Sequence, residues 1–289
     1  MRLQSFAKLN LYLCVLKKRP DNYHNINTLF ERISLHDTLI LTPRRDNKIN
    51  IKCNCPGVPS DKTNLAWRAA RILQEDFGAK RGVDISIIKR IPVGAGLGGG
   101  SSNAASVLTG LNKLWGLKLS PRKLLKYARA IGSDVAFFIY DCPFAEGKGR
   151  GDRIKPLISL KKLRLWHVVV VPSVAVSTAR IYRQLDSVKH RLTRPASDVK
   201  ILLCALRKNR SFINAAALRN DLESVTTRLY PEVRCIKKEL LRLGAKKVLM
   251  SGSGGSVFAT TASKKEASVL AQRLRRKKRP WQVFISHTS

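Results

Sequence analysis

Acidic residues are scarce in this chain of 289 residues, which has 19 Asp and Glu against 55 Lys and Arg. The formal net charge of +36 attracts anions of every kind, including nucleotides, nucleic acid and anionic membranes, without choosing among them. The dense basic run Arg273 to Arg279 is more often a solvated face than a nucleic-acid patch. Charge alone therefore leaves the function open.

Cysteine is also rare and forms no recognisable pattern. The six cysteines are scattered, with one close pair at Cys53 and Cys55, so neither a zinc site nor a disulfide framework follows. No apolar run approaches the roughly 18 residues of a membrane span, and no apolar segment of a signal peptide follows Arg2. We therefore expect a cytoplasmic protein with reduced thiols. The 44% hydrophobic content suffices for a packed core.

Glycine is concentrated in one segment, Pro92 to Ala105, where five glycines fall within seven residues. The segment before it, from Val83 to Ile87, alternates like a strand, and the segment from Ala104 to Leu111 has helical spacing. Glycine is disfavoured inside packed elements but lets anions approach backbone N–H groups at a helix N-terminus. The sequence therefore predicts a phosphate-binding loop between a strand and a helix.

The spacing of the glycines distinguishes between the known types of phosphate-binding loop. A Walker A loop is excluded because no lysine lies between Pro92 and Lys113. Gly94, Gly96 and Gly99 fit a dinucleotide fingerprint, but no acidic residue follows before Asp134. What remains is Pro-x-Gly-x-Gly-Leu-Gly-x-Gly-Ser-Ser, a longer and rarer string that resembles the phosphate loop of the GHMP kinases. A merely flexible glycine-rich loop is disfavoured by its ordered apolar flanks.

Two candidate sites precede the loop. Ser5 to Leu16 alternates like a strand and places Lys8 and Asn10 on the face opposite its leucines, where both side chains can point into a cleft. Tyr23 and His24 follow turn-forming residues and lie at a loop edge. Taken singly, a histidine there is more often structural than functional.

Asp134 is the third candidate, between a helix predicted over Ser120 to Ile131 and the apolar Val135 to Phe138. It can simply cap a helix. Alternatively, a carboxylate beside aromatic rings can be a base in a partly desolvated site.

The rest of the chain predicts mixed helices and strands, with a domain boundary near residues 155 to 163. We expect an exposed loop over Phe144 to Leu157, because this segment has three glycines and many charges. Ser251 to Ser256 is a second glycine-serine turn, either a simple hairpin or part of a site. Other expected elements are strands over residues 30–41, 48–53, 165–171, 247–250 and 281–285, and helices over 64–77, 197–206, 231–243 and, after a capping box at Ser263, in the segment that follows.

Together these motifs resemble the GHMP kinases, and the start Ala7 to Asn10 and the pair Tyr23-His24 point within them to the kinases of 4-diphosphocytidyl-2-C-methyl-D-erythritol. The matches run from residue 7 to 258 and include Asn220 to Glu223 and Gly252 to Gly254. The resemblance implies a two-domain α+β fold. A ribosomal-protein-S5-like domain would span residues 1–158 and a ferredoxin-like domain residues 159–289, with the active site in the cleft between them.

The resemblance also implies an activity: ATP- and Mg²⁺-dependent phosphorylation of the substrate's 2-hydroxyl, on the methylerythritol phosphate route to isoprenoids and terpenoids. Asp134 would accept the hydroxyl proton, and Lys8 would keep Asp134 ionised and offset phosphoryl charge. Mg²⁺ would be held by ATP phosphates with few protein ligands and no dedicated metal site. The implied ATP-binding residues are Pro92, Val93, Gly94, Ala95, Gly96, Leu97, Gly98, Gly99, Gly100, Ser101, Ser102 and, near the adenine, Asn64. The implied substrate-binding residues are Asn10, Tyr23, His24, Thr178 and Tyr182, with the two tyrosines stacking on the cytosine and His24 reading its edge.

Three residues depart from the family pattern. Asn22 replaces a glycine but tolerates a left-handed conformation. Ala136 replaces a proline beside the expected base, and Ala95 would be strained if its φ were positive. Two alternatives stay open: a GHMP kinase of the mevalonate or homoserine type, whose substrates have no base to stack, and a basic nucleic-acid-binding protein on the same fold. The intact Lys8 and Asp134 argue against the latter, and we expect a monomer or weak homodimer with no membrane partner.

Overall fold

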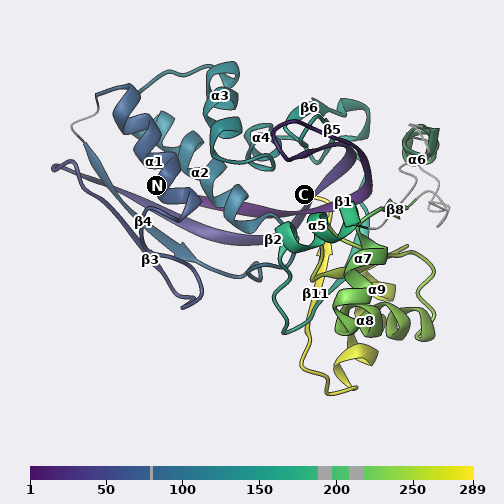
Figure 1. Ribbon diagram of the computed structural model, residues 1–289. Helices are drawn as coiled ribbons and strands as arrows, with labels where there is room; N and C mark the ends of the chain where they lie inside the picture. The colour runs from purple at the N-terminus through teal and green to yellow at the C-terminus, as the bar shows by residue number, and fades with distance from the viewer. Residues whose placement is uncertain (79–80, 188–196, 208–217) are drawn as a thin grey trace.

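The computed structural model describes residues 1–78, 81–187, 197–207 and 218–289, and this part of the chain contains two β-sheets with helices packed on them (Figure 1). The predicted α+β class is confirmed. The first sheet has seven strands, in the order β3-β4-β2-β1-β8 with β5 beside β2 and β6 beside β5. These strands are β1 (Arg2–Lys18), β2 (His24–Arg44), β3 (Ile49–Cys53), β4 (Gly82–Ile88), β5 (Phe144–Lys148), β6 (Arg153–Pro156) and β8 (Arg219–Asn220).

The long antiparallel pair β1 and β2 forms the centre of this sheet. Its register shifts between Phe6 and Ala7 and again between Asn10 and Tyr12, so irregular positions flank Lys8 and Asn10. Such shifts bend a strand and redirect its side chains. The expected strand over residues 5–16 is therefore confirmed, and Lys8 and Asn10 lie between two of its register shifts.

Four helices cover one face of the first sheet: α1 (Leu65–Asp76), α2 (Gly99–Leu114), α3 (Pro121–Ile131) and the short α4 (Val135–Ile139). Figure 1 shows α1, α2 and α3 above the strands. Leu41 and Ile85 from the sheet pack there against Ala104 and Leu108 of α2 in one buried core. The helix approaches closely because Gly110 has no side chain: an added Cβ would lie 2.5 Å from Leu41 Cδ1.

The expected exposed loop over Phe144 to Leu157 is wrong. This segment is the β5–β6 hairpin, and β5 pairs with β2 from Thr28 to Glu31. Its glycines have structural roles that composition does not reveal. Gly147 leaves room for the Phe30 ring, whose Cε2 would lie 2.6 Å from an added Cβ, while Gly149 and Gly151 have positive φ in the turn.

The second sheet has the order β11-β7-β10-β9, made of β7 (Trp166–Val171), β9 (Val248–Met250), β10 (Val257–Thr261) and β11 (Gln282–His287). The predicted strands over residues 165–171, 247–250 and 281–285 are confirmed. The helices of this half are α5 (Thr178–Ser187), α6 (Ser197–Arg207), α7 (Glu223–Leu229), α8 (Pro231–Arg242) and α9 (Lys264–Arg275), with a short 3₁₀ turn, η1 (Ile158–Leu160), before β7. As predicted, Ser263 caps α9 by accepting a hydrogen bond from the Glu266 N–H.

Buried polar contacts join the two sheets. Glu31 of β2 and His167 of β7 are fully buried, and Glu31 Oε1 lies 3.0 Å from His167 Nε2. The Thr288 hydroxyl donates to the same carboxylate at 2.6 Å. β8 also pairs with β1, so a segment late in the chain completes the first sheet.

The domain boundary expected at residue 158 stays a prediction. No helix in the described ranges is long and apolar enough to cross a membrane.

Candidate active site

A cavity of about 1110 Å³ opens where β1, the glycine loop, α5 and the β9–β10 turn meet. It brings together nearly all the residues that the sequence singled out. Those lining it are Lys8, Asn10, Tyr23, His24, Asn64, the loop from Pro92 to Ser101, Asp134, Thr178 and Tyr182. Ser102 is the exception: it is buried and bonded to the Ser5 hydroxyl at 2.8 Å, behind the cavity wall.

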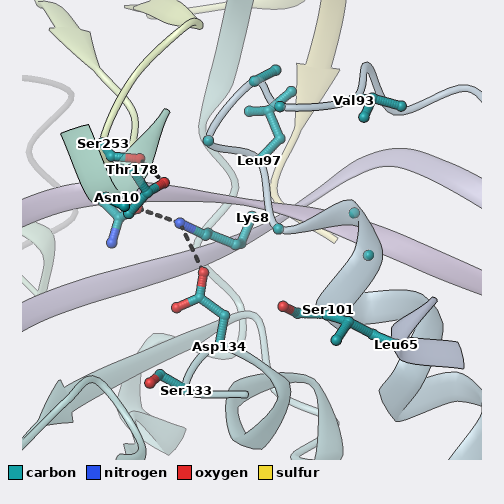
Figure 2. A pocket seen from close by; sticks show the side chains of 18 of the residues that line it. Lys8, Asn10, Leu65, Val93, Leu97, Ser101, Ser133, Asp134, Thr178 and Ser253 are labelled. Atoms are coloured by element: carbon teal, nitrogen blue, oxygen red, sulfur yellow. Dashed lines mark hydrogen bonds and ion pairs between the residues drawn. The ribbon is translucent and has the colours of Figure 1, made fainter. Parts of the chain in front are cut away.

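Lys8 and Asp134 face each other in this cavity (Figure 2). Lys8 Nζ lies 3.4 Å from Asp134 Oδ2. The lysine side chain is only 4% exposed, whereas that of Asp134 is 34% exposed. The cation is thus fixed within the protein, and the carboxylate stays accessible from the cavity, which suits a base that must reach a bound hydroxyl.

Asn10 fixes the position of the lysine. Its Oδ1 accepts a hydrogen bond from Lys8 Nζ at 2.6 Å, and its Nδ2 donates to Thr28 Oγ1 at 2.7 Å. Thr28 in turn donates to the Tyr12 carbonyl at 2.7 Å. The bulged strand therefore presents Asn10 toward the cavity with its amide already engaged by the protein.

Asp134 occupies the N-cap position of α4, but its side chain makes no capping hydrogen bond. Of the two roles that the sequence left open, the capping contact is therefore not formed. The carboxylate points to Lys8 instead, as Figure 2 shows. The backbone of Asp134 is helical, so the replacement of proline by alanine at Ala136 does not prevent this geometry.

The glycine loop owes its shape to alternating positive φ angles, 67° at Gly94, 74° at Gly96 and 70° at Gly98. Ala95 is not among the described residues with positive φ, so the strain considered for it does not arise, and Asn22 does adopt the left-handed conformation, with φ 62°. Gly98 also clears space for the lysine: its Cβ would lie 3.0 Å from Lys8 Cγ. The loop ends at α2, whose first N–H groups can bind anions.

The β9–β10 turn, Ser251 to Ser256, packs against this loop and donates hydrogen bonds to its carbonyl groups. Ser256 donates to the Ala95 carbonyl from both its N–H, at 3.1 Å, and its hydroxyl, at 2.7 Å. Ser251 Oγ donates to the Gly96 carbonyl at 3.2 Å. Gly252 lies beside Lys8, with an added Cβ 3.4 Å from Nζ. This segment is thus a hairpin turn, one of the two alternatives predicted for it, and it also forms a wall of the cavity.

The motif Asn220 to Glu223 holds the turn in place. Asn220 Nδ2 donates to the carbonyls of Met250 at 2.8 Å and Gly252 at 2.7 Å. Asp221 accepts a hydrogen bond from the Val15 N–H of β1 at 2.8 Å. Its residues thus act on the backbone around the cavity rather than inside it.

Asn64 and Thr178 line the cavity with their polar groups already bonded. Asn64 caps α1 through the Ala66 N–H at 2.9 Å and donates to the Pro59 carbonyl at 2.6 Å. Thr178 Oγ1 lies 2.6 Å from Ser253 Oγ, which joins α5 to the β9–β10 turn. Both residues shape the cavity, whichever ligand it takes.

At the far end of the cavity lies an aromatic group. His24 stacks on Tyr182, with ring centroids 5.3 Å apart, and Tyr23 is 54% exposed. Arg150, from the β5–β6 turn, lies over the Tyr23 ring, with Cζ 5.2 Å from the centroid. Burial raises the pKa of the Tyr182 hydroxyl, so it is protonated at neutral pH.

Sequence reasoning missed several polar lining residues, among them Asp186, Arg150 and Lys89. Asp186 binds His24 and Lys18, at 2.8 and 2.7 Å, and lies one helical turn after Tyr182, which is a detectable spacing. Arg150 was hidden by the wrong loop assignment. Lys89 lies just before the glycine string, and its Nζ pairs with the fully buried Asp37 at 2.7 Å. No pattern marked Asp37, although it also accepts hydrogen bonds from the N–H groups of residues 90 and 91.

The donors present fit Mg²⁺ as a companion of bound phosphates. The described residues hold no cluster of three or more His, Cys, Asp or Glu that could bind a metal. However, Mg²⁺ typically uses one or two protein oxygens together with phosphates and water. The cavity offers the Ser101 hydroxyl and the Asp134 carboxylate, and the buried Asn103 Oδ1 has no hydrogen-bond partner in the described part of the chain.

Two family profiles match the chain: GHMP kinases N terminal domain over residues 64–142 and GHMP kinases C terminal over residues 202–279. A curated 4-diphosphocytidyl-2-C-methyl-D-erythritol kinase of Alkaliphilus metalliredigens is 43% identical over 258 residues, 89% of this chain and 87% of the relative. One of Bacillus subtilis is 41% identical over 254 residues, 87% of this chain and 85% of the relative.

Solved structures agree. A crystal structure of a 4-(cytidine 5'-diphospho)-2C-methyl-D-erythritol kinase superposes with a TM-score of 0.83 and 35% identity, covering 100% of both chains. The L. major mevalonate kinase, solved with R-mevalonate, has a TM-score of 0.78 at 16% identity, covering 100% of this chain and 96% of its own. At that identity the second likeness concerns the fold alone.

Proposed function

Because this chain belongs to the family of 4-diphosphocytidyl-2-C-methyl-D-erythritol kinases, we propose that Lys8 and Asp134 transfer phosphate from ATP to the 2-hydroxyl of that substrate. The chain is an ATP-dependent GHMP kinase of isoprenoid biosynthesis. One observation carries the assignment of roles: the Lys8–Asp134 pair, 3.4 Å apart, lies in the same cavity as the glycine loop.

The glycine loop holds the phosphates of ATP. Its backbone N–H groups and the Ser101 hydroxyl are the donors, at the N-terminal end of α2. Phosphoryl transfer depends mainly on positioning and on stabilising the developing charge, so a fixed loop beside a fixed cation supplies most of what is needed. The turn Ser251 to Ser256 keeps the loop in place.

Asp134 accepts the proton of the substrate hydroxyl. Lys8 Nζ lies 3.4 Å from this carboxylate, and the attraction between the opposite charges keeps the carboxylate facing the cavity. The same ammonium offsets negative charge on the transferring phosphoryl group. Asn10 Oδ1 accepts a hydrogen bond from Lys8 Nζ and so holds the ammonium where it can contact both Asp134 and the phosphoryl group.

Mg²⁺ completes the site as we propose it, with Ser101 as the protein oxygen next to the loop. When bound, it neutralises charge on the phosphates of ATP. The chain's own residues still position the acceptor hydroxyl and take its proton.

The aromatic end of the cavity recognises the cytosine. Tyr23 and Tyr182 offer ring faces on which any base can stack, and such stacking contributes about 1 to 3 kcal/mol per base. The polar group of His24 selects among bases. Thr178 and Asn10 face the middle of the cavity, where the diphosphate and the methylerythritol would lie.

We extend the proposal to the setting of the enzyme: a cytoplasmic monomer or weak homodimer with domains at residues 1–158 and 159–289, and no nucleic-acid partner. All six cysteines are free thiols, which supports a reducing compartment. The net charge of +36 has no role in the reaction as proposed.

A substrate panel tests the proposed function. ADP release by the purified protein is measured with Mg·ATP and 4-diphosphocytidyl-2-C-methyl-D-erythritol, mevalonate or homoserine. We expect release with the cytidyl substrate alone. Release with mevalonate or homoserine instead would assign the chain to another GHMP kinase activity, and silence of the folded protein with all three would refute the kinase proposal.

A further inference from the structure

Asp186 of α5 contacts the histidine proposed to read the base. Its Oδ1 lies 2.8 Å from His24 Nε2, and its Oδ2 accepts a hydrogen bond from Lys18 Nζ at 2.7 Å. The His24 side chain is 2% exposed, and its ring is held against Tyr182. Neither the imidazole nor the carboxylate can therefore reorient freely.

This contact decides which ring nitrogen carries the proton. Burial acts to raise the pKa of Asp186, but hydrogen bonds from Lys18 and His24 outweigh it and leave the pKa below its ordinary value. An ionised carboxylate only accepts hydrogen bonds, so His24 Nε2 must be the donor. Neutral His24 then has a bare Nδ1, for which the described residues provide no partner.

A ring nitrogen without a proton, such as this Nδ1, accepts a hydrogen bond. Cytosine and uracil differ in the group at C4 that would face it. Cytosine carries an amino group at C4, which donates, whereas uracil carries an oxygen there, which accepts. We propose that Asp186 is a specificity-determining residue, which fixes the His24 tautomer so that Nδ1 accepts from the cytosine amino group and repels uracil. This inference rests on the proposed function, because it concerns the base of the same substrate.

A purely structural role for Asp186 makes a different prediction. The Lys18–Asp186 ion pair joins β1 to α5, and exposed pairs of this kind contribute little to stability. In that case loss of Asp186 would affect cytidyl and uridyl substrates equally. The ratio of kcat/KM for the cytidyl and uridyl substrates therefore distinguishes a structural role of Asp186 from a role in base specificity.

The first experiment compares kcat/KM for the cytidyl substrate and for its uridyl analogue, in wild type and in Asp186→Asn. An asparagine can donate or accept, so both His24 tautomers become accessible. We expect wild type to prefer cytosine by about 10² or more, as polar readout permits, and the preference to fall at least about tenfold in the variant. KM for ATP should stay within about threefold of wild type, because the glycine loop is untouched.

Three variants control this experiment. His24→Gln should also lose the preference, Lys18→Met should keep it because the His24 contact remains, and Asp141→Asn, an exposed carboxylate paired with Arg32, should match wild type. An unchanged preference in Asp186→Asn would overturn the inference, whether or not His24→Gln loses it. An equal loss in Lys18→Met would overturn it too, since the ion pair would then be the cause.

A second measurement needs no substrate, so it separates this inference from the proposed function. In ¹⁵N-resolved NMR spectra, with the His24 signals assigned by their absence in His24→Gln, wild type should show a protonated Nε2 and an unprotonated Nδ1 at neutral pH. Asp186→Asn should shift both nitrogens toward a mixture of tautomers. A proton on Nδ1 of wild type would overturn the inference, and an inactive wild type with the expected spectrum would refute only the proposed function.

Discussion

Lys8 Nζ lies 3.4 Å from Asp134 Oδ2, although the lysine belongs to the first strand and the aspartate precedes α4. The backbone N–H of the same lysine donates to the Leu97 carbonyl of the glycine loop at 2.9 Å. One residue thus contacts both the proposed base and the proposed phosphate site. This link positions the two halves of the reaction relative to each other.

Replacing Lys8 by methionine should lower kcat about 10²- to 10³-fold, the usual effect of removing one charge-stabilising donor. KM for both substrates should change less, because the loop and the aromatic end are untouched. Steady-state kinetics measure both quantities. The control Lys148→Met removes a 62% exposed lysine and should leave kcat unchanged, and a Lys8→Met enzyme within threefold of wild type would contradict the role.

Gly96→Ala should destabilise the loop and raise KM for ATP. The residue has φ 74°, and an added Cβ would lie 2.4 Å from the Ser251 carbonyl oxygen, so the loop and the turn would have to separate. Gly116→Ala is the matched control, because Gly116 also has positive φ, 66°, but nothing lies within 4 Å of its added Cβ. Thermal unfolding and ATP titration test both. Equal behaviour of the two variants would disprove the packing argument.

Tyr23→Ala should weaken use of the cytidyl substrate. Loss of one stacking face, about 1 to 3 kcal/mol, corresponds to a fall in kcat/KM of roughly 5- to 150-fold. A substrate analogue without the base should lose far less. The variant Phe77→Ala, which removes another exposed aromatic ring, serves as control. If both substrates of Tyr23→Ala suffer equally, Tyr23 does not stack on the base.

Asp46, remote from the cavity, should contribute to stability in a pH-dependent way. Hydrogen bonds from Arg44 lower its pKa to about 2. Because the folded pKa is below the unfolded value of about 3.9, the contribution is fully present above pH 4 and is lost as the pH falls toward 2. The free energy of unfolding of wild type should therefore exceed that of Asp46→Asn at pH 6, with the difference shrinking in acid. Urea titrations at several pH values measure it, and a constant difference would be inconsistent with the ion pair.

Sequence patterns predicted many of the helices and strands, because capping residues and hydrophobic alternation within each segment determine them. Ser120 and Ser263 cap their helices as predicted, and the alternation in β1 identified the face that carries Lys8 and Asn10. The β5–β6 hairpin was missed because its glycines serve contacts with distant residues, above all that of Gly147 with Phe30. Composition registers a glycine but not the ring that needs its space.

The same division holds for the site. Residues within dense motifs, such as the glycine loop, were located, whereas Asp186, Arg150 and Lys89 line the cavity through tertiary contacts that no short motif contains. Ser102 shows the converse, since a residue within a motif can be buried: its hydroxyl accepts a hydrogen bond from Ser5, and its place in the ATP site stays a prediction. A motif names a segment, and only the fold decides which of its side chains face the ligand.

The most direct test of the account is the single-turnover rate of Asp134→Asn, measured by rapid quench with saturating Mg·ATP and the cytidyl substrate. Asparagine keeps the size of the side chain but cannot accept the proton, so we predict a fall of about 10² or more, with binding of both substrates little changed. The exposed Asp141→Asn is the control and should react like wild type. A rate within about threefold of wild type in Asp134→Asn would contradict its assignment as the base.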